Sequence, residues 1–131
     1  MAFEGKYIES VGRRKTSIAR VRLFSGKGEI VVNEKSMPTY FPVAKLRQLV
    51  EQPLTVAGLG GSAVSIHVTG GGIKGQAEAI RLGIARCLVK QNEEMRTVLK
   101  KDGLLSRDSR RRERKKPGKL SARRSPQWSK R

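Results

Sequence analysis

The stretch SIARVRLFSGKGEIVVN, residues 17–33, decides what kind of fold this chain can form. Ala19, Val21 and Leu23 fall on one face of an extended strand, and the two arginines between them fall on the other, because side chains alternate along a strand. The glycine-rich segment 25–28 predicts a hairpin turn, and the run EIVVN after it predicts a returning strand. The stretch therefore predicts strands of a sheet with an apolar face and a basic face.

Outside this stretch, residues 1–105 predict one α/β domain. The short elements expected there are a strand over 6–11, a basic turn over 12–16, a helical turn begun by Ser36 with Pro38 at its first position, an extended piece over 54–56, a turn over 58–61 and a strand over 62–69. The apolar spacing of VAKLRQLVEQ predicts a helix over 43–52, which Pro53 should stop.

The longest helix signal covers residues 74–91. Its apolar residues repeat at helical spacing and predict a buried stripe made of Ala77, Ile80, Ile84, Cys87 and Leu88. The charged residues of the same segment, Lys74, Glu78, Arg81 and Lys90, are expected to face water. Asn92 predicts the N-cap of a further short helix, and Gly103 predicts its C-terminal cap.

The last 26 residues, 106–131, are strongly basic and have almost nothing to bury. They hold twelve of the chain's 29 lysines and arginines against only Asp108 and Glu113, and their large apolar side chains are Leu120 and Trp128. Such a segment cannot offset an ordering entropy of about 1–2 kcal/mol per residue. We therefore expect a globular domain over residues 1–105, followed by a tail over 106–131 that is disordered when free and extended when bound.

A net charge of +18 indicates a polyanionic partner. A protein that binds anionic membranes should carry a basic amphipathic helix, whereas the densest charge here lies in a segment broken by proline and serine, so nucleic acid is favoured and no membrane partner is expected. The N-terminus lacks the apolar run of a signal peptide, and no window approaches the ~18 apolar residues of a membrane span. The expected location is the cytoplasm.

The motif GGGIKG, residues 70–75, is the one most open to a chemical interpretation, because it lies between a predicted strand and a predicted helix, as a dinucleotide fingerprint does. A second helix follows, however, where a parallel strand should carry the ribose-binding acid. The alternatives are a tight turn, or glycine amides that bind an RNA phosphate beside Lys74. His67 is expected to face solvent or RNA and Cys87 to be buried, and no metal-ligand or nucleophile–base set appears. No enzyme, cofactor or metal is expected.

Several segments together resemble the bacterial form of the ninth protein of the small ribosomal subunit. They cover nearly the whole chain and are VGRRKTSIARV (11–21), GKGEIVVN (26–33), QPL (52–54), VTGGGIKGQAEAIRLGIAR (68–86), LLSRDSRRRERKKPG (104–118) and SPQWSKR (125–131). The resemblance implies an α+β fold with a mostly antiparallel four-stranded sheet backed by helices, as in the second domain of the fifth small-subunit protein. It also implies binding to the 3′ major domain of small-subunit ribosomal RNA in the head, beside the tenth and fourteenth small-subunit proteins, with the seventh nearby.

The residues expected to bind ribosomal RNA are the basic ones of the 12–16 turn, the strand after it, the glycine turn and the tail. They are Arg13, Arg14, Lys15, Arg20, Arg22, Lys74, Arg107, Arg110, Arg111, Arg112, Arg114, Lys115, Lys116, Lys119, Arg123 and Arg124. Because the family's tail reaches the peptidyl site, the resemblance implies that Ser129, Lys130 and Arg131 approach the anticodon stem-loop of the bound tRNA. Trp128 can stack there on a base or a ribose.

Two other functions fit part of the sequence. A free nucleic-acid chaperone or DNA-compacting protein would bind any polyanion with a steep salt dependence, and composition alone allows it. A nucleotide-using enzyme would rest on residues 70–75 alone.

Overall fold

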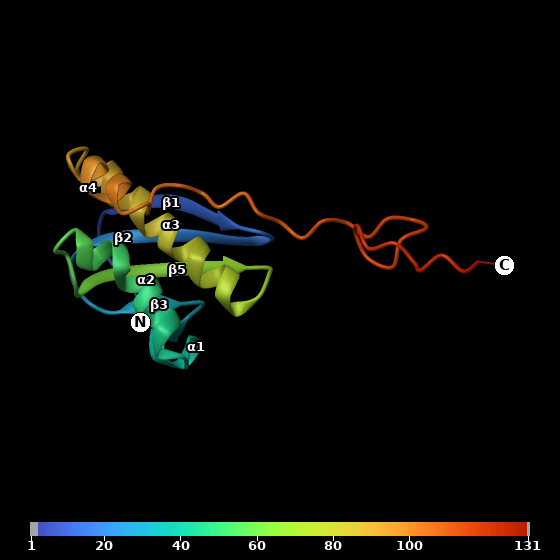
Figure 1. Cartoon of the computed structure of the whole chain (residues 1–131). Coiled ribbons are helices and arrows are strands. Elements are labelled where there is room, and N and C mark those ends of the chain that lie inside the picture. The colour runs from blue at the N-terminus through green and yellow to red at the C-terminus, as the bar shows by residue number, and fades with distance from the viewer. Residues whose placement is uncertain (1–2, 131) are drawn as a thin grey trace.

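In the computed structural model, which describes residues 3–130, a twisted sheet is covered on one face by helices, and the C-terminal tail leaves from one end of the sheet (Figure 1). The strands are β1 (Tyr7–Arg14), β2 (Ser17–Lys27), β3 (Ile30–Val32), β4 (Lys35–Ser36) and β5 (Ser62–Thr69). The helices are α1 (Met37–Tyr40), α2 (Ala44–Val56), α3 (Ile73–Gln91) and α4 (Met95–Lys101). None of these helices is long and apolar enough to cross a bilayer.

The sheet has the order β1-β2-β5-β3-β4, and every neighbouring pair is antiparallel except β3 and β5, which are parallel. The expected α+β class with a mostly antiparallel sheet is confirmed. The structure has five strands where four were expected, because the two-residue β4 pairs with β3 at the edge.

The hairpin predicted at 25–28 is wrong, because β2 and β3 do not pair with each other. After β3 the chain passes through α1 and α2 and returns as β5, which inserts between β2 and β3. Val64, Ile66 and Val68 of β5 are all buried, so the central position of this strand follows from its apolar face. The pairing of β5 with β2 and β3 joins segments far apart in sequence, so the residues of the glycine turn at 25–28 do not indicate it.

The basic turn predicted over 12–16 is mostly strand. β1 continues to Arg14, and only Lys15 and Thr16 turn, with Lys15 at φ 53°. Gly12 therefore lies inside a strand, and its lack of a side chain lets β1 contact helix α3 directly. A Cβ at this position would lie 1.9 Å from the carbonyl oxygen of Ala79 on α3, so only glycine lets the helix approach β1 this closely.

Pro53 does not stop α2, and residues 54–56 are helical where an extended piece was expected. A proline inside a helix costs about 3 kcal/mol, because it lacks the N–H that bonds the preceding turn. Here Pro53 and Leu54 are both buried, and the amide of Ala57 donates to the carbonyl of Pro53 at 3.0 Å. Burial of this last turn offsets the missing hydrogen bond.

The junction between α3 and α4 also differs from expectation. Asn92 is the C-cap of α3, and its side-chain oxygen accepts the amide of Glu94 at 3.1 Å, so α4 begins only at Met95. The expected glycine cap of α4 is present, since Gly103 has φ +73°. Gly103 and Leu104 donate their amides to Lys100 and Leu99, which is the hydrogen-bond pattern of a Schellman motif, and Leu104 is buried.

Helix α3 forms the centre of the core. It packs on β1 and β2 on one side and against α2 on the other. The five residues of its predicted stripe are all buried, which confirms that part of the prediction. Gly83 also faces the sheet, where a Cβ would lie 2.6 Å from Cγ2 of Val21. Small residues on this face let the longest helix lie directly on the backbone of the sheet.

Candidate nucleic-acid interface

The start of the tail is fixed to the body by Arg14, the last residue of β1. Side chains alternate along the strand, so Arg14 points toward α3, where it is only 7% exposed. Its Nε donates to Oε2 of Glu78 at 2.8 Å, and its Nη1 donates to the carbonyl oxygen of Arg110 at 2.6 Å. Its Nη2 lies 3.4 Å from Oδ2 of Asp108. We call this set of contacts, made by Arg14, Glu78, Asp108 and Arg110, the tail clasp.

Glu78 was expected to face water, but it is half-buried because Arg14 reaches it. Asp108 accepts both the backbone amide and the guanidinium of Arg110, and these hydrogen bonds hold the pKa of the Asp108 carboxyl well below its usual range. The same carboxylate raises the pKa of Arg110. An acid on α3 and an acid in the tail thus share one buried arginine.

Beyond the clasp, the tail folds back into a loop closed by Glu113. Its carboxylate accepts hydrogen bonds from Lys116 and, at 2.8 Å, from Arg123, and these bonds lower its pKa. The amide of Leu120 donates to the carbonyl of Arg124 at 2.8 Å. Together with the turn between β1 and β2, this loop surrounds an open hollow of about 960 Å³, lined by Lys15, Thr16, Arg111, Arg112, Glu113, Arg114, Lys115, Leu120, Ser121 and Ala122.

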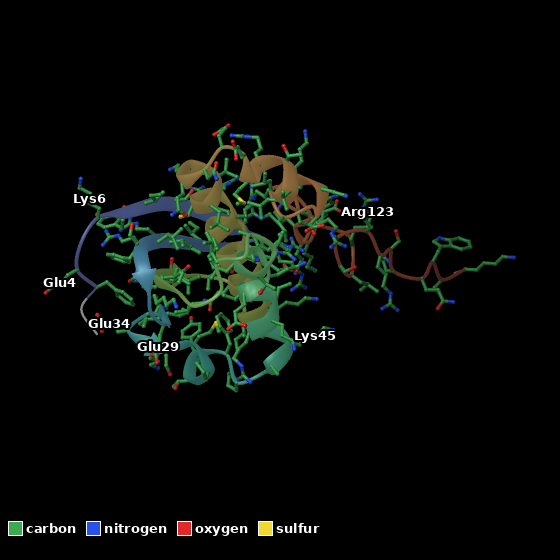
Figure 2. The ribbon with its side chains drawn as sticks, turned by 90° about the vertical axis from the view of Figure 1, so that its left-hand side faces the viewer. Glu4, Lys6, Glu29, Glu34, Lys45 and Arg123 are labelled. Carbon is green, nitrogen blue, oxygen red and sulfur yellow. The ribbon has the colours of Figure 1, made fainter. Side chains whose placement is uncertain are left out.

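The tail carries its cations on the outside, and no helix or strand forms from residue 106 to residue 130. Its exposed predicted residues are Arg107, Arg110, Arg111, Arg112, Arg114, Lys115, Lys116, Lys119, Arg123, Arg124, Ser129 and Lys130. Trp128 is 81% exposed, so its ring is free to stack. Arg131 lies outside the described residues. In Figure 2 the tail, on which Arg123 is labelled, projects from the side of the body opposite to Glu4, Glu29 and Glu34.

The sheet face that the helices leave open holds a second basic group. Arg20 and Arg22 project from β2, and with Ser65 and His67 of β5 they line a shallow hollow of about 300 Å³. Both arginines share one acid, Glu9, at 3.3 and 3.7 Å. The guanidinium of Arg22 also lies 4.9 Å from the ring centre of Tyr7. His67 is exposed on this face, as expected.

Arg13 and Arg14 are neighbours in sequence but have opposite environments. Arg13 is exposed, whereas Arg14 is taken up by the clasp. Lys15, in the turn, is exposed beside the hollow of the tail. The structure therefore brings Lys15 together with the tail arginines, separates Arg20 and Arg22 onto the open sheet face, and places Arg14 under the tail.

The glycine motif at 70–75 forms a tight turn that packs on β2. Gly70 and Gly71 have φ of +76° and +64°, and a Cβ at Gly71 would lie 2.1 Å from Oγ of Ser17. Lys74 is exposed at the start of α3. Within residues 3–130 a second helix follows α3 and no strand does, and no cluster of His, Cys, Asp or Glu could hold a metal ion. The glycines are explained by backbone geometry and close packing, so the dinucleotide interpretation loses its only support.

Two cations of α3 were not predicted to have a structural role. Arg86 donates to the carbonyl of Val11 at 2.6 Å, and Lys90 donates to the carbonyl of Glu9 at 2.7 Å. Both acceptors belong to β1, one of the two edge strands, so these side chains occupy carbonyl groups that would otherwise be free to pair with another chain. A signal for this role exists in the sequence, since Glu78, Leu82, Arg86 and Lys90 recur every four residues along one face of the helix.

Comparison with known proteins identifies relatives over almost the whole chain. A family model described as "Ribosomal protein S9/S16" matches residues 12–131. The chain is 55% identical to a protein of Cytophaga hutchinsonii named "Small ribosomal subunit protein uS9", with 95% of this chain and 98% of that protein covered. Proteins with the same name from Amoebophilus asiaticus and Azobacteroides pseudotrichonymphae are 54% and 48% identical, each with the same coverage.

Proposed function

The chain belongs to the ribosomal protein S9/S16 family, and on that premise we propose that it is a structural, non-enzymatic component of the small subunit of the cytoplasmic ribosome, where it binds ribosomal RNA. Its RNA site is the 3′ major domain in the head of the subunit, and the end of its tail contacts the anticodon stem-loop of tRNA in the peptidyl site. Its protein neighbours there are the tenth and fourteenth small-subunit proteins, with the seventh nearby.

The observation that carries this proposal is the basic tail fixed at one end of a folded body. Twelve of the 29 lysines and arginines lie in residues 106–131, and only Asp108 and Glu113 oppose them. Both acids are already engaged within the tail and the clasp, so most of the cations remain exposed to a polyanion. Of the eleven tail cations that the structure describes, Arg110, Lys116 and Arg123 are paired with these acids and the other eight are exposed without an acidic partner. Guanidinium groups among them can pair with phosphate oxygens in a bidentate geometry.

The geometry supports a division of the tail into two parts. The loop over 111–124 lies beside Lys15 and offers a concave cationic surface that fits a folded ribosomal RNA backbone. Residues 126–130 carry one exposed aromatic ring and Lys130, a combination suited to a base and a phosphate of tRNA. From the clasp to Arg131 a fully extended chain reaches at most about 80 Å, long enough to leave one RNA and touch another.

The test of the tRNA contact is a chain that lacks residues 129–131, incorporated into small subunits. We expect weaker binding of tRNA in the peptidyl site and poorer maintenance of the reading frame, with the melting temperature of the free protein unchanged. The matched control is the double variant Lys100→Gln and Lys101→Gln, which removes the same number of side-chain cations from α4, at the other end of the body. Equal tRNA affinity in the deletion and the full chain would refute the contact.

Competition separates this proposal from a free chaperone that binds any polyanion. Full-length protein is mixed with labelled ribosomal RNA of the 3′ major domain and an excess of bulk DNA. A structural ribosomal component keeps its RNA as DNA is added at constant salt, whereas a chaperone distributes between the two according to phosphate concentration. Loss of ribosomal RNA in proportion to added DNA would favour the chaperone.

A further inference from the structure

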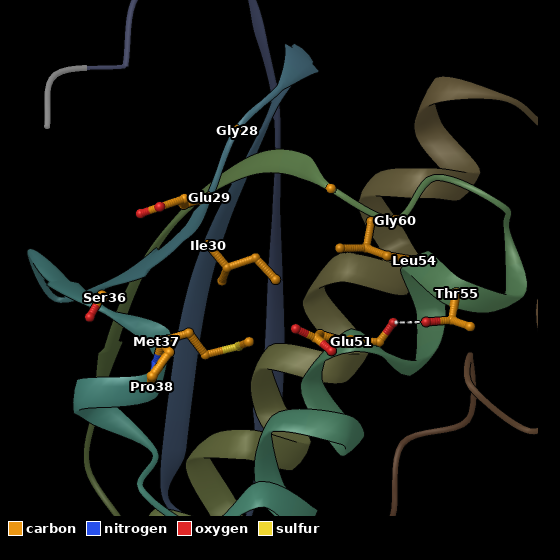
Figure 3. Close-up of a pocket in the computed structure, with 11 residues that line it drawn as sticks. Gly28, Glu29, Ile30, Ser36, Met37, Pro38, Glu51, Leu54, Thr55 and Gly60 are labelled. Carbon is orange, nitrogen blue, oxygen red and sulfur yellow. Dashed lines mark hydrogen bonds between the residues drawn. The ribbon is translucent and has the colours of Figure 1, made fainter.

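A groove at the end of the body remote from the tail is apolar and acidic, whereas the tail and its hollow are basic. It has a volume of about 560 Å³ and lies between the β3–β4 region, α1 and the C-terminal half of α2. Its floor is apolar and is made of Ile30, Met37 and Leu54, of which Met37 and Leu54 are almost fully buried (Figure 3). The register of β2 with β5 sets its distance from the tail, because the groove lies beyond the Lys27–Ser62 pair and the tail passes the turn at the opposite end of β2.

The groove is lined by acids and by no lysine or arginine. Glu51, on α2, points its carboxylate across the floor toward Met37, and Glu29 stands at the opposite rim with its side chain turned outward (Figure 3). Among residues 3–130, neither carboxylate lies within 4.0 Å of a cationic group, although Lys27 and Lys35 flank this region in sequence. By the same measure Glu9, Glu78, Glu93, Asp108 and Glu113 are paired. Glu4, Glu34, Glu94 and Asp102 are unpaired as well, but none of them lines the groove.

Glu51 is exposed, and of the six acids that lack a cation within 4.0 Å among residues 3–130, only Glu29 and Glu51 line this groove. RNA phosphate is excluded from the groove by charge, and a neutral apolar ligand would desolvate Glu51 without giving it a partner. Lysine and arginine satisfy both features at once, because their aliphatic stems cover apolar surface while the charged head reaches a polar group. A carboxylate and a guanidinium then form a charge-assisted hydrogen bond.

We propose that this groove docks a basic segment of another protein, with the stem of a lysine or arginine on Met37 and Ile30 and its cationic head on Glu51. The interaction is independent of RNA binding by the tail, because the two surfaces lie at opposite ends of the sheet. The body therefore has two faces of opposite specificity: one for nucleic acid and one for a cationic peptide.

The test uses the full chain and a fluorescent peptide that alternates lysine, leucine and arginine, with binding followed by anisotropy. Glu51→Gln keeps the size of the side chain and removes its charge, and we expect it to weaken binding about tenfold. Thr55→Arg places a cation on the exposed rim of the groove and should weaken binding by at least as much. Glu94→Gln is the matched control, because Glu94 is an exposed acid outside the groove and its removal should leave the affinity unchanged.

Replacing the leucines of the peptide with serine should also weaken binding, because the floor of the groove then gains no apolar contact. Equal affinity of wild type, Glu51→Gln and Thr55→Arg would overturn the proposal, since the peptide would then bind by bulk charge alone. Sedimentation of the free chain measures its oligomeric state and gives a second result that could overturn the proposal. A dimer that dissociates in Glu51→Gln would show that the basic tail of a second copy, and not another protein, occupies the groove.

Discussion

Replacing Arg14 with methionine should destabilise the body by about 2 kcal/mol, even though the arginine was expected only to bind RNA. The substitution keeps an unbranched apolar stem but removes the guanidinium, which leaves Glu78 and Asp108 without their shared cation. Removing one partner of a fully buried pair costs about 3–5 kcal/mol, and an exposed pair contributes about 0–1 kcal/mol. The side chain of Arg14 is 8% exposed and that of Glu78 is 21% exposed, which places the loss between these limits because the orphaned carboxylate regains part of its hydration.

Urea unfolding at neutral pH measures this loss, and it corresponds to a fall in Tm of roughly 10 °C for a domain of this size. The double variant Arg14→Met and Glu78→Met is the control, because removing both charges should restore most of the stability. Trypsin gives a second measurement, since release of the clasp should speed cleavage after Arg107 and Arg110. A loss below about 0.5 kcal/mol, with cleavage unchanged, would make the pair equivalent to a surface ion pair and refute the reasoning.

Three further predictions concern the close packing, the buried thiol and the pH dependence of the clasp. Gly12→Ala should cost about 3 kcal/mol or more, because its Cβ would lie 1.9 Å from a backbone oxygen of Ala79 that cannot turn aside; thermal unfolding followed by circular dichroism measures this, and a loss under about 1 kcal/mol would contradict it. Burial raises the pKa of Cys87 to about 12, so a thiol reagent at pH 8 should modify it only as fast as the protein unfolds, and rapid modification of the native protein would show the thiol to be accessible. The pKa of Asp108 is lowered chiefly by its hydrogen bonds with Arg110. The contribution of this carboxylate to the stability of the clasp is therefore fully present above its unfolded pKa of about 3.9, and it is lost as pH falls through its pKa in the folded protein. Limited pepsin digestion across acid pH should therefore show release of the tail at a higher pH in Asp108→Asn than in wild type, and identical profiles would contradict the role of this carboxylate.

The strands and the long helix could be predicted because each has a local pattern. Ala19, Val21 and Leu23 alternate, and residues 62–69 and the stripe of α3 were found at almost their observed positions. The order of the strands could not be found in this way. It depends on β5 entering the sheet between β2 and β3, a contact between segments separated by two helices.

The candidate site, too, could be predicted only where the signal is local in sequence. Composition alone identifies the basic tail, because no folding partner is needed for a run of cations to attract a polyanion. It cannot distinguish Arg13 from Arg14, whose different fates depend on how far β1 continues past the predicted turn. The continuation of α2 through Pro53 was missed for a similar reason, since the burial that offsets the proline comes from residues distant in sequence.

The position of the clasp at the last residue of β1 has a mechanical consequence. In Figure 1 the tail leaves the body in nearly the direction in which β1 runs, so tension on the tail pulls Arg14 along the strand axis. The ladder between β1 and β2, which pairs Tyr7 with Phe24 at one end and Arg14 with Ser17 at the other, is then loaded in shear, with its hydrogen bonds sharing the force. An anchor of this geometry lets the body resist a pull on the tail without opening the sheet one hydrogen bond at a time.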